Sequence, residues 1–180
     1  VYGGGGNLGS VWQRDFVELR NNSGAPVDIS GWSVQYASAA GTFSAANTAV
    51  FPTGATVPAW GYFLVGLSQG TGGTTPLPTP DFDGVATGTG AILMSGTNGK
   101  VALVNTGTPA PSCTDASVVD LVGYGSASCS ETAPTAVLSN TSAAVRNTNG
   151  CTDTGNNASD FTIATANNFQ PLNSQSPTFT

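Results

Sequence analysis

The chain has 180 residues and a formal net charge of −6 at pH 7, with four basic residues, ten acidic residues and no histidine. Only 8% of the residues are charged, and glycine, threonine, serine and asparagine together make up 80 of the 180 residues. Side chains that favour helix are therefore too scarce for a helical bundle or a coiled coil. The acidic balance excludes direct nucleic-acid binding through a basic patch, and the 39% of hydrophobic residues excludes disorder driven by charge.

Short runs of β-branched and aromatic residues, separated by clusters of glycine, proline, asparagine and aspartate, predict an all-β protein. Trp32, Val34 and Tyr36 alternate with polar residues, as in a strand with one buried face. Asn98-Gly99 predicts a tight hairpin that pairs 91–94 with 101–104. The predicted strands are Phe16–Leu19, Val27–Ile29, Trp32–Tyr36, Tyr62–Leu67, Ala91–Met94, Val101–Val104, Val118–Val122, Ala143–Arg146 and Phe161–Ile163. Together they predict one domain over residues 1–180, built as a two-sheet β-sandwich.

Two stretches rich in glycine, proline and threonine interrupt this strand pattern, at residues 68–90 and 105–117. Loops of this length inside a compact domain are usually functional or mobile. The alternative is that they decorate a stable sandwich without a role of their own.

Three cysteines, Cys113, Cys129 and Cys151, occur without C-x-x-C spacing, which indicates disulfide use and therefore an oxidising, extracellular compartment. We predict a Cys113–Cys129 disulfide, whose loop closure would stabilise the fold by roughly 3 kcal/mol. The competing pair is Cys129 with Cys151. In the first pairing, Cys151 is either a buried small side chain or an intermolecular partner. No apolar run is long enough to predict a membrane span.

The absence of histidine excludes Ser-His-Asp and Cys-His nucleophilic sites. Carboxylate pairs could still act as acid and base in a small hydrolase. Asp15 and Glu18 would point to opposite faces of a strand. Asp81 and Asp83 would share a face, but the sequence around them offers no cation or apolar support to tune their pKa values. A carboxylate-based hydrolase is therefore the weakest of the functional hypotheses.

Oxygen-bearing side chains gather in the segment 151–160, which suits a hard cation such as Ca²⁺. The predicted ligands are Asp153, Asn156, Asn157 and Asp160, and Ca²⁺ is the one candidate cofactor of a chain that otherwise requires none. The alternative is an Asx-turn whose side chains bond local backbone amides.

Several segments, in order and spacing, resemble the lamin-tail domain. They are Asp15–Asn21, Val27–Val34 and Pro58–Val65, while Val1–Asn7, Gly99–Asn105, Val119–Gly125 and Asp153–Asn157 resemble its bacterial secreted branch. The resemblance implies an immunoglobulin-like β-sandwich without known catalytic residues. It also implies a module of the kind attached to secreted nucleases, phosphatases and surface proteins. Relatives usually carry a second acid at Gly155, so one candidate metal ligand is missing here.

Relatives also generally carry a β-strand that begins before the Tyr-Gly-Gly-Gly-Gly segment, and this sequence retains only a stub of it. A missing edge strand exposes backbone groups that another chain can pair with. We expect the tail 169–180 of another copy to supply that strand, giving open-ended filaments. The alternative is that the tail folds back on its own domain. The predicted assembly residues are Val1, Tyr2, Phe169, Leu172 and Phe179.

The resulting functional prediction is a secreted, non-catalytic structural module of the cell surface or matrix. Its expected partners are copies of itself or other surface proteins and glycans. An accessory binding or tethering domain of a larger secreted nuclease or phosphatase is the main alternative.

Overall fold

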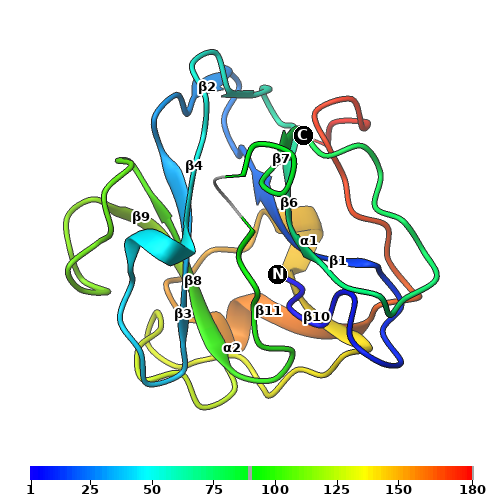
Figure 1. The fold of residues 1–180 in the computed structure, drawn as a ribbon. Coiled ribbons are helices and arrows are strands. Elements are labelled where there is room, and N and C mark those ends of the chain that lie inside the picture. The colour runs from blue at the N-terminus through cyan, green and yellow to red at the C-terminus, as the bar shows by residue number, and fades with distance from the viewer. Residues whose placement is uncertain (89–90, 180) are drawn as a thin grey trace.

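The computed structural model describes residues 1–88 and 91–179, so Thr180 and the end of the predicted loop 68–90 lie outside it. Two β layers pack face to face, with β4-β3-β8-β9 in one and β7-β6-β1 together with β10-β11 in the other (Figure 1). The strands are β1 (Arg14–Arg20), β2 (Val27–Asp28), β3 (Ser33–Ser38), β4 (Thr48–Val50), β5 (Thr56–Val57), β6 (Tyr62–Gln69), β7 (Phe82–Asp83), β8 (Gly99–Val104), β9 (Val118–Tyr124), β10 (Ser142–Arg146) and β11 (Phe161–Thr165). The helices are single turns: η1 (Ala45–Asn47), α1 (Asn147–Gly150) and α2 (Asn157–Asp160).

The first two residues join the parts of the second layer. The Val1 nitrogen donates to the Ala144 carbonyl at 2.8 Å, and the Ala144 N–H donates back to Val1 at 3.0 Å. Tyr2 and Phe16 exchange two backbone hydrogen bonds, both at 3.0 Å. Val1 and Tyr2 therefore form a very short strand that lies between β1 and β10.

The main core fills the space between the two layers. β3 and β8 contribute Val34, Tyr36 and Val101, and the facing layer contributes Val17 and Val65, all almost fully buried. Apolar side chains that alternate along strands of two facing sheets are what a sandwich core requires. The immunoglobulin-like β-sandwich predicted from the sequence is confirmed.

The prediction that Trp32–Tyr36 buries only one face is wrong, because β3 is buried on both. Ser33 and Gln35 are inaccessible to solvent. The Gln35 carboxamide donates to the Thr108 carbonyl at 2.8 Å and accepts from the Ala110 N–H at 2.9 Å. The long loop 105–117 thus covers the outer face of this sheet, so polar side chains there are satisfied by backbone rather than by water.

Residues Gly3–Gly6 cross closely against other backbone segments. A Cβ on Gly5 would lie 1.8 Å from the Arg14 carbonyl carbon, and one on Gly4 would lie 2.6 Å from the Asn140 Cα. Only glycine permits such an approach. This packing holds the chain in place just after Val1 and Tyr2.

The predicted strand Ala91–Met94 and its hairpin with 101–104 are wrong, because β8 pairs with β3 and β9 instead. The 91–94 segment is irregular and buries Ile92 and Met94 in the main core. Its backbone bonds go elsewhere: Ser68 donates to the Ile92 carbonyl, and the Met94 N–H donates to the Asp15 carboxylate at 2.8 Å.

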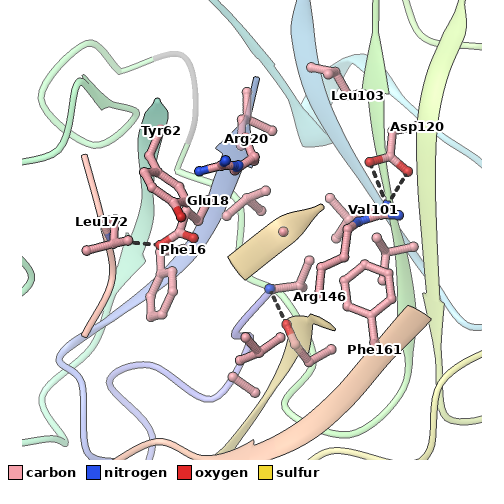
Figure 2. Close-up of a pocket in the computed structure, with 18 of the residues that line it drawn as sticks. Phe16, Glu18, Arg20, Tyr62, Val101, Leu103, Asp120, Arg146, Phe161 and Leu172 are labelled. Carbon is pink, nitrogen blue, oxygen red and sulfur yellow. Dashed lines mark hydrogen bonds and ion pairs between the residues drawn. The ribbon is translucent and has the colours of Figure 1, made fainter. Parts of the chain in front are cut away.

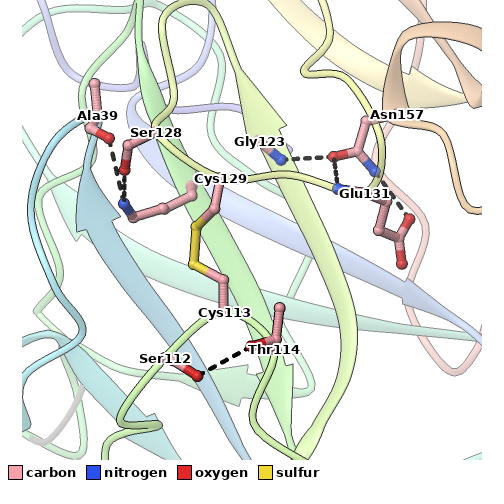
Figure 3. The surroundings of a disulfide bond; sticks show 10 residues. Ala39, Ser112, Cys113, Thr114, Gly123, Ser128, Cys129, Glu131 and Asn157 are labelled. Atoms are coloured by element: carbon pink, nitrogen blue, oxygen red, sulfur yellow. Dashed lines mark hydrogen bonds between the residues drawn. A yellow bond between two sulfur atoms is a disulfide. The ribbon is translucent and has the colours of Figure 1, made fainter.

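A disulfide joins Cys113 and Cys129, with their Cα atoms 6.5 Å apart, and it ties the loop 105–117 to the segment after β9 (Figure 3). The alternative bridge from Cys129 to Cys151 is therefore wrong. Cys151 is a free and exposed thiol, so the prediction that it could be a buried side chain is also wrong.

Candidate functional site

A groove of about 430 Å³ lies between β1 and β10, where the Val1–Tyr2 strand stops (Figure 2). Its size falls within the range of ligand-binding sites in proteins. β1 and β10 form its two long walls, β8 and β9 form its floor, and the segment 169–172 lies along its outer side. The residues that line the groove include Val1, Glu18, Arg20, Val34, Val101, Leu103, Arg146, Phe169 and Leu172.

Backbone groups of both walls face the groove. In an antiparallel ladder, alternate residues turn their N–H and C=O groups to the same side. Because the backbone N–H and C=O of Phe16 bond Tyr2, the backbone N–H and C=O of Glu18 and Arg20 point to the same side, into the groove. Ala144 bonds Val1, so those of Arg146 point in from the other wall. Both walls of the groove therefore present the backbone N–H and C=O groups of strand residues to it.

The two sides of the groove differ in character. Val1 packs against the main core, which at the floor presents Val34, Val101 and Leu103. Tyr2 points the other way, into a second cluster with Phe16 and the partly buried Phe169. A strand continuing this line would alternately face the apolar floor and the outer side, because successive side chains alternate.

Charged groups occupy the inner end of the groove. Burial lowers the pKa of the Val1 ammonium to about 6, against the opposing influence of the Glu18 charge. Burial also raises the pKa of Glu18, although the Leu172 N–H donates to its carboxylate at 2.6 Å. Both groups are removed from water, so an occupant carrying its own charge would be disfavoured here.

Two arginines frame the far end of the groove. Arg146 lies over the Phe161 ring at 4.6 Å, and its Nη2 donates to both carboxylate oxygens of Asp120, each at 2.8 Å. Arg20 lies over the Tyr62 ring at 4.8 Å. Their guanidinium groups are held by these contacts and by carbonyl oxygens, so the groove mouth is built from fixed side chains.

The structure folds the C-terminal tail back onto its own domain. Phe169 packs against Phe16 with ring centroids 6.1 Å apart. Leu172 bonds Glu18, as above, and the Ser174 N–H donates to Asp81 at 2.9 Å. Phe179 touches Tyr62 edge-on with centroids at 6.3 Å and remains 43% exposed. All five predicted assembly residues thus lie within or beside the same region of β1, β6 and β10.

The acidic residues proposed for catalysis are used in structural bonds. Asp15 accepts from the Gly5 and Met94 N–H groups, both at 2.8 Å, and burial raises its pKa to about 7. Asp81 accepts from the Leu64 N–H at 2.8 Å. Asp83 forms a bidentate pair with Arg14 that, opposed by partial burial, holds its pKa at about 2. The expectation that no cation supports this pair is wrong for Asp83, because Arg14, 69 positions away, forms an ion pair with it.

The four predicted Ca²⁺ ligands do not converge on one point. Carboxylate oxygens of Asp153 and Asp160 lie with one of Glu131 within 4.8 Å of one another. The Asn156 side chain instead accepts from the Ala158 N–H, as an N-cap. Asn157 turns its carboxamide to β9, where it accepts from the Gly123 N–H at 2.8 Å (Figure 3). The same carboxamide donates to the Leu121 carbonyl at 2.9 Å. Calcium binding stays a prediction, now carried by the three carboxylates.

Sequence reasoning missed the roles of Asp15 and Asn157. Asp15 fastens the glycine segment to the 91–94 segment, and Asn157 occupies the open edge of β9. Both act on backbone groups brought together from distant parts of the chain, and neither short-range spacing nor residue type signals this.

Comparison with protein-family models matches residues 1–126 to the Lamin Tail Domain. The match ends just after β9, so β10, β11 and the tail that complete the groove lie outside it. A search of curated proteins found no match. No helix among residues 1–88 and 91–179 is long and apolar enough to cross a membrane. Since the matched region covers more than half of the chain, this protein belongs to the lamin tail domain family, whose members are non-catalytic, immunoglobulin-like interaction modules.

Proposed function

We propose that this chain is a secreted, non-catalytic structural module that associates with copies of itself by β-strand addition in the groove between β1 and β10. The observation that carries the proposal is the position of Val1 and Tyr2 as a short strand between these two walls. β1 and β10 line this groove, and Glu18, Arg20 and Arg146 direct backbone groups into it. Such an arrangement accepts an extended peptide through main-chain hydrogen bonds.

Two further properties support self-association outside the cell. The Cys113–Cys129 disulfide requires an oxidising compartment to persist. Low charge density means that little electrostatic repulsion opposes close packing of identical chains. A contact in which one copy donates and the next accepts is heterologous, and repetition of it produces filaments rather than closed rings.

The test is the size of the disulfide-bonded protein as a function of concentration, measured by light scattering and electron microscopy. We expect mass to grow with concentration and elongated particles to form. Leu103→Glu places a carboxylate in the floor of the groove and should reduce association at least tenfold. Leu93→Glu is the matched control, because Leu93 is 67% exposed and does not line the groove. A wild-type protein that stays monomeric at every concentration contradicts the proposal.

The accessory-domain hypothesis keeps the same groove but gives it a different occupant, namely a peptide of an attached or neighbouring secreted enzyme. It is favoured by the interaction role of the family. The full reading frame separates the two hypotheses, since a nuclease or phosphatase domain on the same chain would favour the accessory role.

A further inference from the structure

One exposed serine hydroxyl lies against a buried lysine side chain. The Lys100 Nζ donates to the Ser128 Oγ at 2.6 Å and to the Ala39 carbonyl at 3.2 Å. Ser128 is exposed, whereas Lys100 is only 2% exposed. We propose that these two residues form a nucleophile–base pair, through which an activated ester acylates the protein at Ser128. Neither residue lines the groove, so this inference is independent of the proposed self-association.

The surroundings of Lys100 favour a neutral amine. Lys100 lies on β8 opposite Ala37 of β3 and Gly123 of β9, neither of which is charged. Within residues 1–88 and 91–179, no carboxylate lies within ion-pair distance of its Nζ. Burial therefore lowers the pKa of the Lys100 ammonium, with no charged side chain opposing the change. The neutral amine is the form that can accept a proton from a hydroxyl group.

Ser128 is held in place on both sides. Its N–H donates to the Ala39 carbonyl at 2.8 Å, and the next residue, Cys129, is joined to Cys113 by the disulfide (Figure 3). The Ala39 carbonyl thus binds both the backbone of Ser128 and the ammonium of Lys100. A nucleophile and a base held at hydrogen-bond distance are arranged for proton transfer before a reactant arrives.

A serine–lysine pair needs no histidine. The chain lacks histidine, which excludes nucleophilic sites that depend on an imidazole base. Lysine takes the place of that base in serine–lysine sites, provided that its amine is neutral at the working pH. Residue type and spacing gave no signal of the pair, because 28 positions separate Lys100 from Ser128.

The proposed step exchanges one ester for another. The Lys100 amine accepts the Ser128 hydroxyl proton while the Oγ attacks the carbonyl carbon of the activated ester. The bond between the Oγ and that carbon forms, the bond from the carbon to the leaving oxygen breaks, and the leaving group takes the proton from Lys100. No electrons are gained or lost, and no further reactant is needed. The product is an ester on Ser128, formed once per chain without turnover.

A backbone N–H next to Ser128 is available to the reacting carbonyl group. Within residues 1–88 and 91–179, the N–H of Cys129 makes no hydrogen bond. The N–H of the residue after a nucleophilic serine can stabilise the negative charge that develops on the acyl oxygen. The segment after β9 therefore supplies a donor for that oxygen as well as the nucleophile.

The experiment treats the protein with an alkyl fluorophosphonate, which reacts with activated serine hydroxyls, and locates the adduct by peptide mapping. We expect labelling of Ser128 to be at least about tenfold faster than labelling of Ser126. Ser126 is the matched control, because it is exposed in the same segment and its hydroxyl donates to Asn98 at 3.2 Å instead of contacting a lysine. Ser128→Ala should abolish the adduct.

Lys100→Arg separates a base from a structural cation. Arginine keeps a positive charge and donor groups for the Ala39 carbonyl and Ser128, but it does not lose its proton. We expect labelling of Ser128 to fall at least about tenfold in this variant, with a melting temperature close to that of the wild type. In the wild-type protein, the labelling rate should rise with pH and level off below about 10, as a lysine of lowered pKa loses its proton.

The outcomes bear on this site alone. Equal labelling of Ser128 and Ser126, or equal labelling of Ser128 in Lys100→Arg and the wild type, overturns the assignment. If Lys100→Arg does not fold, the wild-type pH profile decides, and a rate that still rises with pH above about 10 overturns the role of Lys100. Either failure leaves the proposed self-association intact, because that proposal uses neither residue.

Discussion

The outer edge of β9 and the gap between β1 and β10 differ in how their backbone hydrogen-bonding groups are covered. At β9, the Asn157 carboxamide bonds Gly123 and Leu121, and Thr135 exchanges backbone bonds with Gly123 and Gly125. At the gap, Val1 and Tyr2 fill only the first part of the space. Edge strands invite pairing with other chains unless they are covered. Backbone groups along β9 thus have partners within the chain, whereas Glu18, Arg20 and Arg146 direct theirs into the groove.

The proposed association uses the groove rather than β9, because Asn157 and Thr135 cover the outer edge of β9. Substitutions that uncover β9 should change the free energy of unfolding without changing which segment binds in the groove. Substitutions near Val1 and Tyr2 should change the groove itself. The following predictions separate these effects, beginning with the largest.

Gly5→Ala should prevent stable folding. The added Cβ would lie 1.8 Å from the Arg14 carbonyl carbon, so the backbone of β1 or of the glycine segment must move. Such overlap in a buried crossing costs upward of about 4 kcal/mol. Gly9→Ala is the control, because Gly9 has a φ of +79° but nothing within 4 Å, and it should cost only about 1 kcal/mol. Equal urea midpoints for the two variants would show that this crossing does not position the groove.

Stability should fall as pH rises from about 4 to about 7, because burial raises the pKa of Asp15 to about 7. A raised carboxyl pKa means that the folded state binds more protons than the unfolded state, so folding weakens as pH rises through this interval and levels off above it. The change is on the order of 3 kcal/mol. Asp15→Asn should flatten most of this slope in urea titrations at successive pH values.

Other buried titratable groups also contribute to the change of stability with pH. Burial also raises the pKa values of Glu18 and Glu131, so a smaller fall should remain in the variant. The Val1 ammonium acts in the opposite sense, because its lowered pKa favours folding as pH rises from about 6 to 8. An unchanged slope in Asp15→Asn would rule out Asp15 as its source.

Asn157→Ala should destabilise the protein by about 2–3 kcal/mol, because it leaves the Gly123 N–H and the Leu121 carbonyl buried without their partner. It should also create a second associating edge at β9, seen as association that survives Leu103→Glu. Asn156→Ala is the matched control, since this half-buried cap makes no bond to β9 and its loss should cost about 1 kcal/mol. Similar losses in both variants would contradict the role given to Asn157.

The calcium hypothesis predicts the smallest effect, a rise of a few degrees in the melting temperature with Ca²⁺ relative to EGTA. Glu131→Gln should remove that rise, because Glu131 completes the three carboxylates with Asp153 and Asp160. Asp115→Asn is a control carboxylate outside this group. Identical melting curves with Ca²⁺ and with chelator remove the hypothesis.

The sequence predicted the fold better than the site, for a physical reason. Strands rich in β-branched and aromatic residues, such as β1, β3 and β6, were found, because burial in the sandwich favours short runs of such side chains. β2 falls within the predicted strand Val27–Ile29, whereas β4, β5 and β7 were missed, because two or three residues are too few to show a period. The 91–94 segment was misread as a strand because its apolar residues are buried in the core without a strand partner.

The groove could be anticipated only in part. The family resemblance drew attention to the strand around Val1 and Tyr2, and the groove is lined by Val1 and its neighbours on β1 and β10. The sequence gives no signal that β1 and β10 form the two walls of the groove, because Glu18 and Arg146 are 128 positions apart. They are brought together by the hydrogen bonds that Val1 forms with β10. Asn157 shows the same limit, since its residue type suggested a metal ligand and its position made it an edge cap.

The most direct test of the strand-acceptor groove is amide hydrogen exchange at Arg20 and Arg146 in dilute and in associated protein. Their N–H groups face the groove, so association should slow their exchange at least tenfold, while amides of the covered strand β3 remain unchanged. Exchange at Arg20 and Arg146 that stays as fast in the associated protein as in the dilute protein would contradict strand addition at this site.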